Sequence, residues 1–149
     1  MSAALRKLVF VLADIDGYSD FTCARESLEI FHLMASYYEV ADAVITEQQG
    51  ELIKTIGDAI FFVFPDDVLS DFEERINDIK DALDGWLGQV KDGLNVSILA
   101  HVGEAAIGPI ATPSCRWIDT FGEDVNELFM MTGKGIVFSD RLKERLSTP

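Results

Sequence analysis

The order of apolar and polar residues along the chain predicts an alternation of buried strands and amphipathic helices. In "KLVFVLADIDGYSDF" a continuous apolar run from Leu8 to Ala13 is typical of a buried strand, and it ends in a polar turn beginning at Asp14. From about Asp20 to Gln48, apolar residues recur every three and four positions. This spacing predicts a long amphipathic helix, either continuous or broken near Met34–Ser36, that ends before Gly50.

The next stretch, "GELIKTIGDAIFFVF", predicts a β-hairpin. Gly57 stands first in a two-residue turn, where type II′ geometry requires a positive φ. In this register Lys54 lies across from Phe61, and alternation puts it on the same strand face as Leu52 and Ile56. Asp58 then projects from the tip of the hairpin.

The second half of the chain continues the alternation. Residues 66–91 return to helical spacing with a polar face rich in Asp and Glu, and "NVSILAHVGEAAIG" predicts a strand that bends at Gly103. After the irregular segment "ATPSCRW", a shorter helix is expected over Glu123–Thr132, followed by "IVF" as a short edge strand. Ser139 is positioned to cap a final helix that reaches residue 146.

This order of elements predicts an α+β fold. It corresponds to a ferredoxin-like βαββαβ core, a sheet with helices packed on one face, plus an extra C-terminal helix-strand-helix segment. The sequence contains no internal repeat, linker or low-complexity segment, and 48% of its 149 residues are hydrophobic. Residues 1–149 are therefore expected to form a single domain with a substantial core.

The composition of the chain argues against some classes of binding partner. The net charge is −14 with only twelve scattered Lys and Arg residues, which argues against a nucleic acid. No apolar run approaches the roughly 20 residues of a membrane span, and no secretory signal precedes the first strand. Cys23 and Cys115 match no metal spacing or disulfide framework, which favours a reducing, cytoplasmic location. A nucleotide ligand would need divalent cations to offset the charge.

Two aspartates are candidate metal ligands. Taken alone, Asp14 is an ordinary turn former or helix cap, and Asp58 suits any hairpin tip. A ferredoxin-like sheet, however, places the first strand beside the hairpin strands, so the two carboxylates are expected at neighbouring strand ends. There they could hold Mg²⁺, which uses one or two carboxylates together with water and phosphate. The turn "DIDGY" adds backbone N–H groups that can receive phosphate oxygens.

Other polar residues carry simpler alternatives. Instead of a role in chemistry, Lys54 could be an edge-strand lysine that extends to solvent or discourages aggregation. His101 within "LAHVG" is more typical of a hydrogen-bonded core histidine than of a ligand or base. The acidic residues of 66–91 are typical of a solvated helix face.

Four segments, in this order, resemble the class III adenylate and guanylate cyclases. "FVLADIDGYSDFT" resembles the first strand and phosphate loop of that family, and "GELIKTIGDAIFFVF" its metal-bearing hairpin. "VSILAHVGEAAIGPI" is similar to the central strand, and "IDTFGEDVN" to the segment that enters the catalytic helix. The resemblance spans about residues 8 to 128.

The resemblance implies roles for individual residues. Asp14 and Asp58 would bind a pair of Mg²⁺ (or Mn²⁺) ions, with Ile15 as a further metal ligand. Lys54 and Asp119 would select adenine, because Lys donates to a ring nitrogen and Asp accepts from the exocyclic amine. The remaining implied roles are ribose positioning by Asn126 and substrate binding by the phosphate-loop residues Asp16, Gly17 and Tyr18.

The family resemblance also implies an antiparallel homodimer that converts ATP to 3′,5′-cyclic AMP. One chain would supply Asp14 and Asp58, and its partner Lys54, Asp119 and Asn126.

The sequence departs from the family pattern at the catalytic helix and near its C-terminal end. Met130 stands where the family has a charge-stabilising arginine, and two further strands bearing a phosphate-binding lysine have no counterpart. Arg116 and Lys134 are the candidates for supplying the missing charge. Two hypotheses stay open: an adenylate cyclase, or a catalytically silent module for nucleotide binding, dimerisation or regulation. A third is a structural ferredoxin-like domain that binds no nucleotide.

Overall fold

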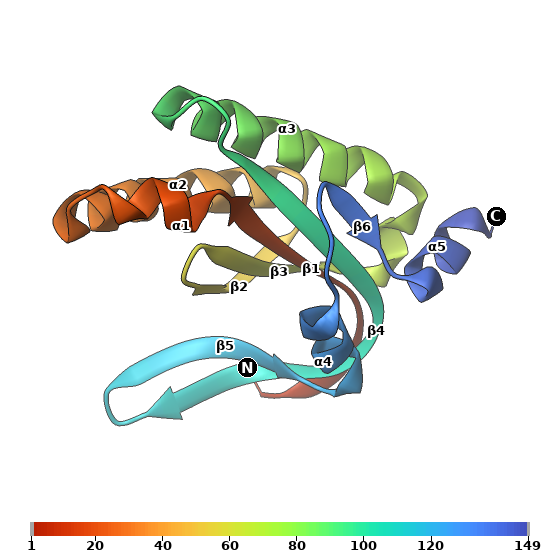
Figure 1. Ribbon diagram of the computed structural model, residues 1–149. Helices are drawn as coiled ribbons and strands as arrows, with labels where there is room; N and C mark the ends of the chain where they lie inside the picture. Colours follow the sequence, from red (N-terminus) through yellow and green to blue (C-terminus); the bar gives the residue numbers. More distant parts are fainter. Residues whose placement is uncertain (1, 149) are drawn as a thin grey trace.

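The computed structural model describes residues 2–148, which form a strongly curved sheet with helices on both of its faces (Figure 1). The elements in chain order are β1 (Ala4–Asp16), α1 (Tyr18–Cys23), α2 (Ser27–Glu47), β2 (Glu51–Ile56), β3 (Ala59–Pro65), the 3₁₀ helix η1 (Asp66–Asp71), α3 (Phe72–Val90), β4 (Asn95–Thr112), β5 (Cys115–Phe121), α4 (Glu123–Met130), β6 (Ile136–Phe138) and α5 (Asp140–Ser147). None of the helices within residues 2–148 combines the length and apolar character needed to cross a lipid bilayer.

The sheet topology confirms the predicted ferredoxin-like core. The strand order is β2-β3-β1-β4-β5, with these neighbours antiparallel. The short strand β6 pairs in parallel with β4. The first four strands and the helices between them therefore follow the βαββαβ pattern, to which β5, α4, β6 and α5 are added.

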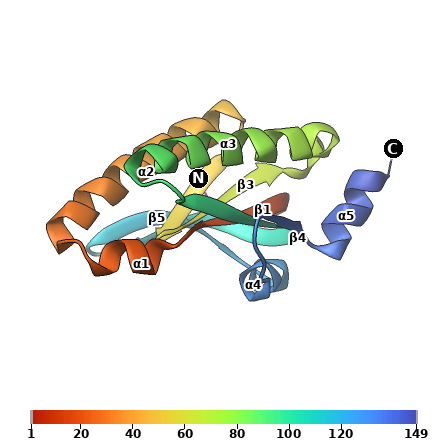
Figure 2. The same ribbon diagram turned by 45° about the horizontal axis from the view of Figure 1, so that its top comes forward.

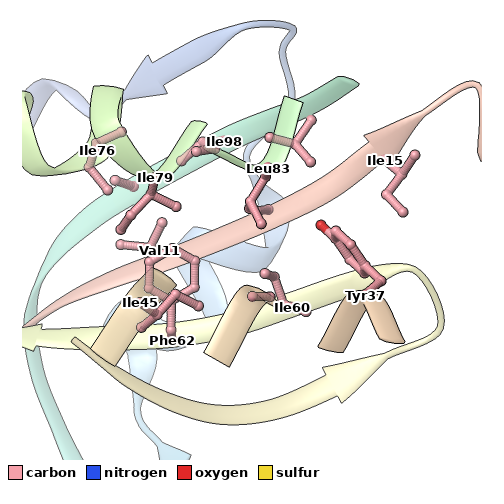
Figure 3. Close-up of a cluster of buried hydrophobic side chains, with 14 of the residues drawn as sticks. Val11, Ile15, Tyr37, Ile45, Ile60, Phe62, Ile76, Ile79, Leu83 and Ile98 are labelled. Atoms are coloured by element: carbon pink, nitrogen blue, oxygen red, sulfur yellow. The ribbon is translucent and has the colours of Figure 1, made fainter. Parts of the chain in front are cut away.

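The main core lies between the sheet and the helices α2 and α3, which run side by side over one face (Figure 2). Figure 3 shows the buried side chains that meet there from both layers. They include Val11, Tyr37, Ile45, Ile60, Phe62, Ile76, Ile79, Leu83 and Ile98. The apolar residues that recur every three and four positions in α2 and α3 are the ones that pack on the sheet.

The prediction of a core with helices on one face is confirmed for α2 and α3, and α4, which belongs to the added C-terminal segment, packs on the opposite face (Figure 2). Its buried residues Val125 and Leu128 join a second apolar cluster with Leu8, Phe10 and Phe61 from the strands. Since both faces of the central strands β1 and β3 are therefore buried, these strands read as continuous apolar runs rather than alternating ones.

The first predicted helix is divided, but not at the expected place. α1 ends at Cys23, the backbone is extended at Glu26 (φ −77°, ψ 145°), and α2 then runs without a break through Met34–Ser36. Met34 is buried against the core, while Ser36 faces solvent, where it does not disturb the helix. The alternative of a break near Met34–Ser36 is therefore wrong.

Two strand predictions also need correction. β1 continues through Asp16, so Asp14 lies in a strand, opposite Ser97 of β4, and not in a turn. The end of β4 and the start of β5 replace most of the segment expected to be irregular, because Thr112 pairs with Cys115 across a two-residue turn. The predicted edge strand "IVF" is confirmed as β6, and Ser139 caps α5 by accepting a hydrogen bond from the Leu142 amide at 3.2 Å.

Candidate functional site

An open cleft of about 280 Å³ lies at the end of β1 and brings Asp14 and Asp58 together. Its lining residues come from the end of β1 and the start of α1, from the tip of the β2–β3 hairpin and from the loop after α4. They are Asp14, Ile15, Asp16, Gly17, Tyr18, Ser19, Asp20, Asp58 and Lys134. The cleft therefore gathers the metal-ligand and phosphate-loop candidates of the sequence.

The hairpin tip is held in place from two sides. Gly57 has φ 61°, and Gln49 is the one non-glycine residue with positive φ among residues 2–148, so the turn has the predicted type II′ geometry. The Tyr38 hydroxyl of α2 donates to the Gly57 carbonyl, and the Asp58 carboxylate (Oδ2) accepts from the Ile15 amide at 3.0 Å. The side chain of Asp58 is therefore fixed beside β1 before any ligand arrives.

The carboxylates in this cleft repel one another. Partial burial raises the pKa of Asp14, and the negative charges of Asp58 and Asp16 raise it further. A divalent cation would relieve this repulsion, and carboxylate oxygens are ligands that Mg²⁺ prefers. Ile15 lies beyond the last β1–β3 pair, and in an extended strand its carbonyl points to the same side as its amide, toward Asp58. Asp14, Asp58 and the Ile15 carbonyl therefore fit a hard divalent metal.

Asp16 is engaged within the protein. Its carboxylate accepts hydrogen bonds from the Ser97 hydroxyl at 2.6 Å and from Lys134 Nζ at 2.9 Å. Burial alone would raise the pKa of Asp16, but these two donors outweigh it and hold the pKa below its usual value. The following residue, Gly17, adopts φ 84°, a left-handed conformation suited to glycine, and leads into α1.

A second polar centre lies on the sheet face that carries α4. Lys54 Nζ is 3.0 Å from Asp119 Oδ1, and the Trp117 indole donates to Asp119 Oδ2 at 3.1 Å. Burial alone would raise the pKa of Asp119, but hydrogen bonds from Lys54, the Thr120 amide and Trp117 lower it. Lys54 and Asp119, to which the family resemblance assigns selection of the base, therefore already form a donor–acceptor pair.

Lys54 reaches this face because β2 is irregular. The register shifts between Leu52 and Lys54, so that Leu52 pairs with Phe62 while Lys54 pairs with Phe61, as predicted. The prediction that Lys54 shares a face with Leu52 is wrong, since Leu52 packs on the core under α2 and α3 and Phe61 belongs to the other cluster. A bulge adds one residue to a strand and reverses the alternation beyond it.

α4 carries Asn126 and Met130 on its exposed surface. The Met130 side chain is 77% exposed at the end of the helix. Neither residue lines the cleft that holds Asp14 and Asp58. Within one chain the predicted site residues therefore fall into two groups: the cleft residues, and a group on the α4 face formed by Lys54, Asp119 and Asn126.

His101 is a hydrogen-bonded core histidine, as expected, and lies beneath α4. Nδ1 lies 2.7 Å from the Ser139 hydroxyl and Nε2 lies 2.9 Å from the Glu127 carboxylate. His101, Asp124 and Glu127 offer potential metal-ligand atoms within 4.8 Å of one another. The Arg141 guanidinium, however, lies 2.7 Å from Asp124 Oδ1 and already supplies a positive charge there.

The acidic helix face expected over 66–91 borders a larger groove along η1 and α3. Its acidic lining residues are Asp71, Glu73, Glu74 and Asp78. It shares no lining residue with the Asp14–Asp58 cleft. Because the predicted metal-ligand and phosphate-loop residues line the cleft at the end of β1, the functional site is sought there.

Sequence reasoning missed three contributors to these sites: Trp117, Ser97 and Tyr38. Trp117 carried a usable signal, because it stands two residues before Asp119 and so shares its face once β5 is recognised as a strand. Ser97 and Tyr38 carried none, since their partners Asp16 and Gly57 are distant in the sequence.

Comparison with known proteins points to one family. A model described as "Adenylate and Guanylate cyclase catalytic domain" matches residues 3–137. An adenylate cyclase of Anabaena cylindrica is 26% identical over 164 residues, which cover 99% of this chain and 32% of that protein. This chain thus spans about a third of the length of that relative.

Solved cyclase structures have the same fold. The guanylyl cyclase Cya2 superposes with a TM-score of 0.82 at 17% identity, covering 99% of this chain and 82% of that chain. The adenylyl cyclase CyaB from P. aeruginosa superposes with a TM-score of 0.81 at 15% identity, covering 98% and 83%.

Proposed function

The chain belongs to the adenylate and guanylate cyclase catalytic domain family, and we propose that it binds Mg²⁺- or Mn²⁺-ATP and forms 3′,5′-cyclic AMP at the interface of a homodimer. The observation that carries this proposal is the direct contact between Lys54 and Asp119, on a sheet face separate from the Asp14–Asp58 cleft. In this proposal Lys54 and Asp119 read the base, and the Asp14–Asp58 cleft holds the metal. The two lie apart within one chain, so a complete site would take one half from each of two chains.

Asp14 and Asp58, with the Ile15 carbonyl, are the metal ligands in this proposal. The metal ions would favour ionisation of the ribose 3′-hydroxyl and stabilise the charge of the transferred phosphoryl group. In the overall reaction the 3′-oxygen bonds to the α-phosphorus, the bond from that phosphorus to the bridging oxygen of the β-phosphate breaks, and pyrophosphate leaves. Asn126 orients the ribose, while the backbone of Asp16, Gly17 and Tyr18 receives phosphate oxygens.

Adenine is the proposed base because it presents an acceptor at N1 beside a donor at N6. Lys54 donates to the first and Asp119 accepts from the second. The side chains already touch, so the spacing of the pair matches two adjacent atoms on one base edge. Guanine presents a donor at N1 and an acceptor at O6, the reverse order, so a comparison of ATP with GTP tests this assignment directly.

An antiparallel homodimer would join the two half-sites. Around the Lys54–Asp119 pair the face exposes large apolar side chains, among them Ile56 (47% exposed) and Phe121 (61% exposed). Exposed apolar groups of this size beside a polar centre favour burial against a second protein surface. In such a dimer each site takes metal ligands from one chain and base, ribose and helix residues from the other.

A catalytically silent module is the second candidate, favoured by the 77% exposed Met130. A thioether there cannot stabilise negative charge on the α-phosphate. Loss of one such preorganised donor typically lowers kcat about 10²–10³-fold. The chain would then bind nucleotide and dimerise without useful turnover.

The deciding experiment incubates the purified protein with Mn²⁺-ATP and quantifies the cyclic product. Asp14→Asn removes a metal ligand with little change of shape, and Asp42→Asn, on the exposed surface of α2, is the control for charge. Product that disappears in Asp14→Asn but persists in Asp42→Asn supports the cyclase. Metal-dependent ATP binding without product, lost in Asp14→Asn, supports the silent module. Absence of both product and binding contradicts the nucleotide proposals.

A further inference from the structure

We propose that Lys134 binds the triphosphate of the nucleotide, in the same chain whose Asp14 and Asp58 hold the metal. The inference rests on the proposed function and adds a phosphate-binding residue to it. Within one chain, Lys134 lines the cleft, whereas Arg116, the other basic candidate, pairs with Ala111 in the β4–β5 hairpin and lies outside the lining.

Lys134 is positioned at the cleft but free to move within it. Its Nζ lies 2.9 Å from Asp16 Oδ1, at the edge of the β1–α1 turn, and its side chain is 81% exposed. An exposed ion pair of this kind is weak in water, so its ammonium group can turn from a carboxylate to a phosphate at little cost. Lysine is suited to this exchange, because it acts as a compact point charge on a flexible stem.

The backbone that carries Lys134 is anchored to the floor of the site. The Gly135 amide donates to the Ser97 hydroxyl at 3.2 Å, and the Gly135 carbonyl accepts from the Ile98 amide at 2.7 Å. The same Ser97 hydroxyl donates to Asp16 at 2.6 Å. The loop after α4 and the β1–α1 turn are therefore tied through one buried serine, so the root of the lysine stays beside the phosphate loop whether or not its tip is bound to Asp16.

The charge balance of the cleft calls for such a group. The carboxylates that line it belong to Asp14, Asp16, Asp20 and Asp58, and among residues 2–148 Lys134 is the one basic residue in the lining. A pair of divalent ions at Asp14 and Asp58 would balance these four carboxylates, but a triphosphate brings further negative charge. A charge-assisted bond from Lys134 to a phosphate oxygen would offset part of it, and Asp16 would keep its bond from Ser97.

The test measures binding of Mn²⁺ with inorganic tripolyphosphate, a probe that has no base or ribose. Titration calorimetry on the full chain compares the wild type with Lys134→Ala, Lys134→Arg and Lys143→Ala. Lys143 lies exposed on α5 outside the cleft, so its removal makes the same change in net charge. We expect Lys134→Ala to weaken binding about 10- to 100-fold, the range for a hydrogen bond to a charged group, and Lys134→Arg to restore most of it. Equal weakening in Lys143→Ala would overturn the proposal, because the effect would then be a general one of net charge.

A double variant separates contact with phosphate from neutralisation of Asp16. If Lys134 acted solely by offsetting Asp16, then Asp16→Asn combined with Lys134→Ala would bind tripolyphosphate as well as the wild type does, and the proposal would be overturned. We expect the double variant to stay weak. Thermal melting of each variant checks that it is folded.

The failure of this inference is distinguishable from that of the proposed function. If Asp14→Asn loses Mn²⁺-tripolyphosphate binding while Lys134→Ala keeps it, the lysine assignment is wrong and the metal cradle stands. If the wild type binds no tripolyphosphate with Mn²⁺, or Asp14→Asn binds it unchanged, both are overturned. Weak binding in both single variants, with Lys143→Ala unaffected, supports both.

Discussion

Lys54 Nζ lies 3.0 Å from Asp119 Oδ1, although β2 and β5, the strands that carry them, stand at the two ends of the order β2-β3-β1-β4-β5. In a flat sheet these two strands would stand four strand spacings apart, each of roughly 4.8 Å. The curvature of β4 and the outward turn of β5 beneath the sheet bring the two ends together (Figure 1). The contact between the two side chains is therefore a product of sheet curvature.

This pair gives the first prediction. Lys54→Ala should weaken ATP binding about 10- to 100-fold, because it removes a charged donor to the base. Binding of Mn²⁺-tripolyphosphate should stay unchanged, since that probe has no base to read. ATP and GTP affinities are measured by calorimetry. If Lys54→Ala weakens ATP and tripolyphosphate equally, Lys54 does not read the base.

Division of the site between two chains gives the second prediction. Asp14→Asn and Asn126→Ala should each be inactive alone, and an equal mixture should recover about a quarter of wild-type cyclic AMP formation, since half of the dimers are mixed and each contains one intact site. The measurement is product formation after co-refolding or co-expression. A mixture that stays inactive, although each variant dimerises, would argue against shared sites.

The raised pKa of Asp14 gives the third prediction. Only the ionised carboxylate binds metal, so Mn²⁺ affinity should fall as pH is lowered through this raised pKa, beginning above the ordinary aspartate value of 3.8. Because folded Asp14 holds its proton more tightly than the unfolded chain does, metal-free stability should fall as pH rises from that ordinary value through the raised one.

Asp14→Asn removes this dependence. At neutral pH without metal it should raise the melting temperature, because one of the mutually repelling charges is gone, and added Mn²⁺ should stabilise it less than the wild type. Asp42→Asn should behave as the wild type in both respects. A lower melting temperature for metal-free Asp14→Asn would show that repulsion does not dominate in the cleft.

Gly103 gives the fourth prediction. A Cβ atom at this position would lie 2.0 Å from the Asp124 carboxylate. That carboxylate accepts hydrogen bonds from the Glu104 amide and from the Arg141 guanidinium. Gly103→Ala should therefore push the start of α4 away from β4 and lower the free energy of unfolding by about 1–3 kcal/mol, the range for overpacked sites. Chemical denaturation measures the change.

Gly88 is the matched control. It lies exposed within α3, and an added Cβ there meets nothing within 4 Å. Gly88→Ala should raise the free energy of unfolding by about 0.5–1 kcal/mol, because alanine restricts the unfolded chain and favours helix. Equal effects of the two substitutions would mean that Asp124 moves aside freely.

Periodicity was enough for the order of the elements, apart from β5 and the division between α1 and α2, and Gly57 was enough for the type II′ hairpin. The apolar runs of β1 and β3, the spacing of α2 and α3, and Gly57 are local features, and each depends on interactions among residues close in sequence. β5 was missed because its strand character comes from pairing with β4, and the short segment "CRWIDTF" has little apolar alternation of its own.

The sequence by itself determined which residue types are present for chemistry: two aspartates at strand ends, a lysine in a hairpin and an asparagine early in a helix. Only the tertiary structure decided how they are grouped. The bulge in β2 turned Lys54 to the other face, sheet curvature brought it to Asp119, and the Gly135–Ser97 bond set Lys134 beside the cleft. These placements bring together residues that are far apart in the sequence: Lys134 and Ser97 are 37 positions apart, and Lys54 and Asp119 are 65 positions apart. No local propensity encodes such distances, because they depend on how whole strands twist and pack.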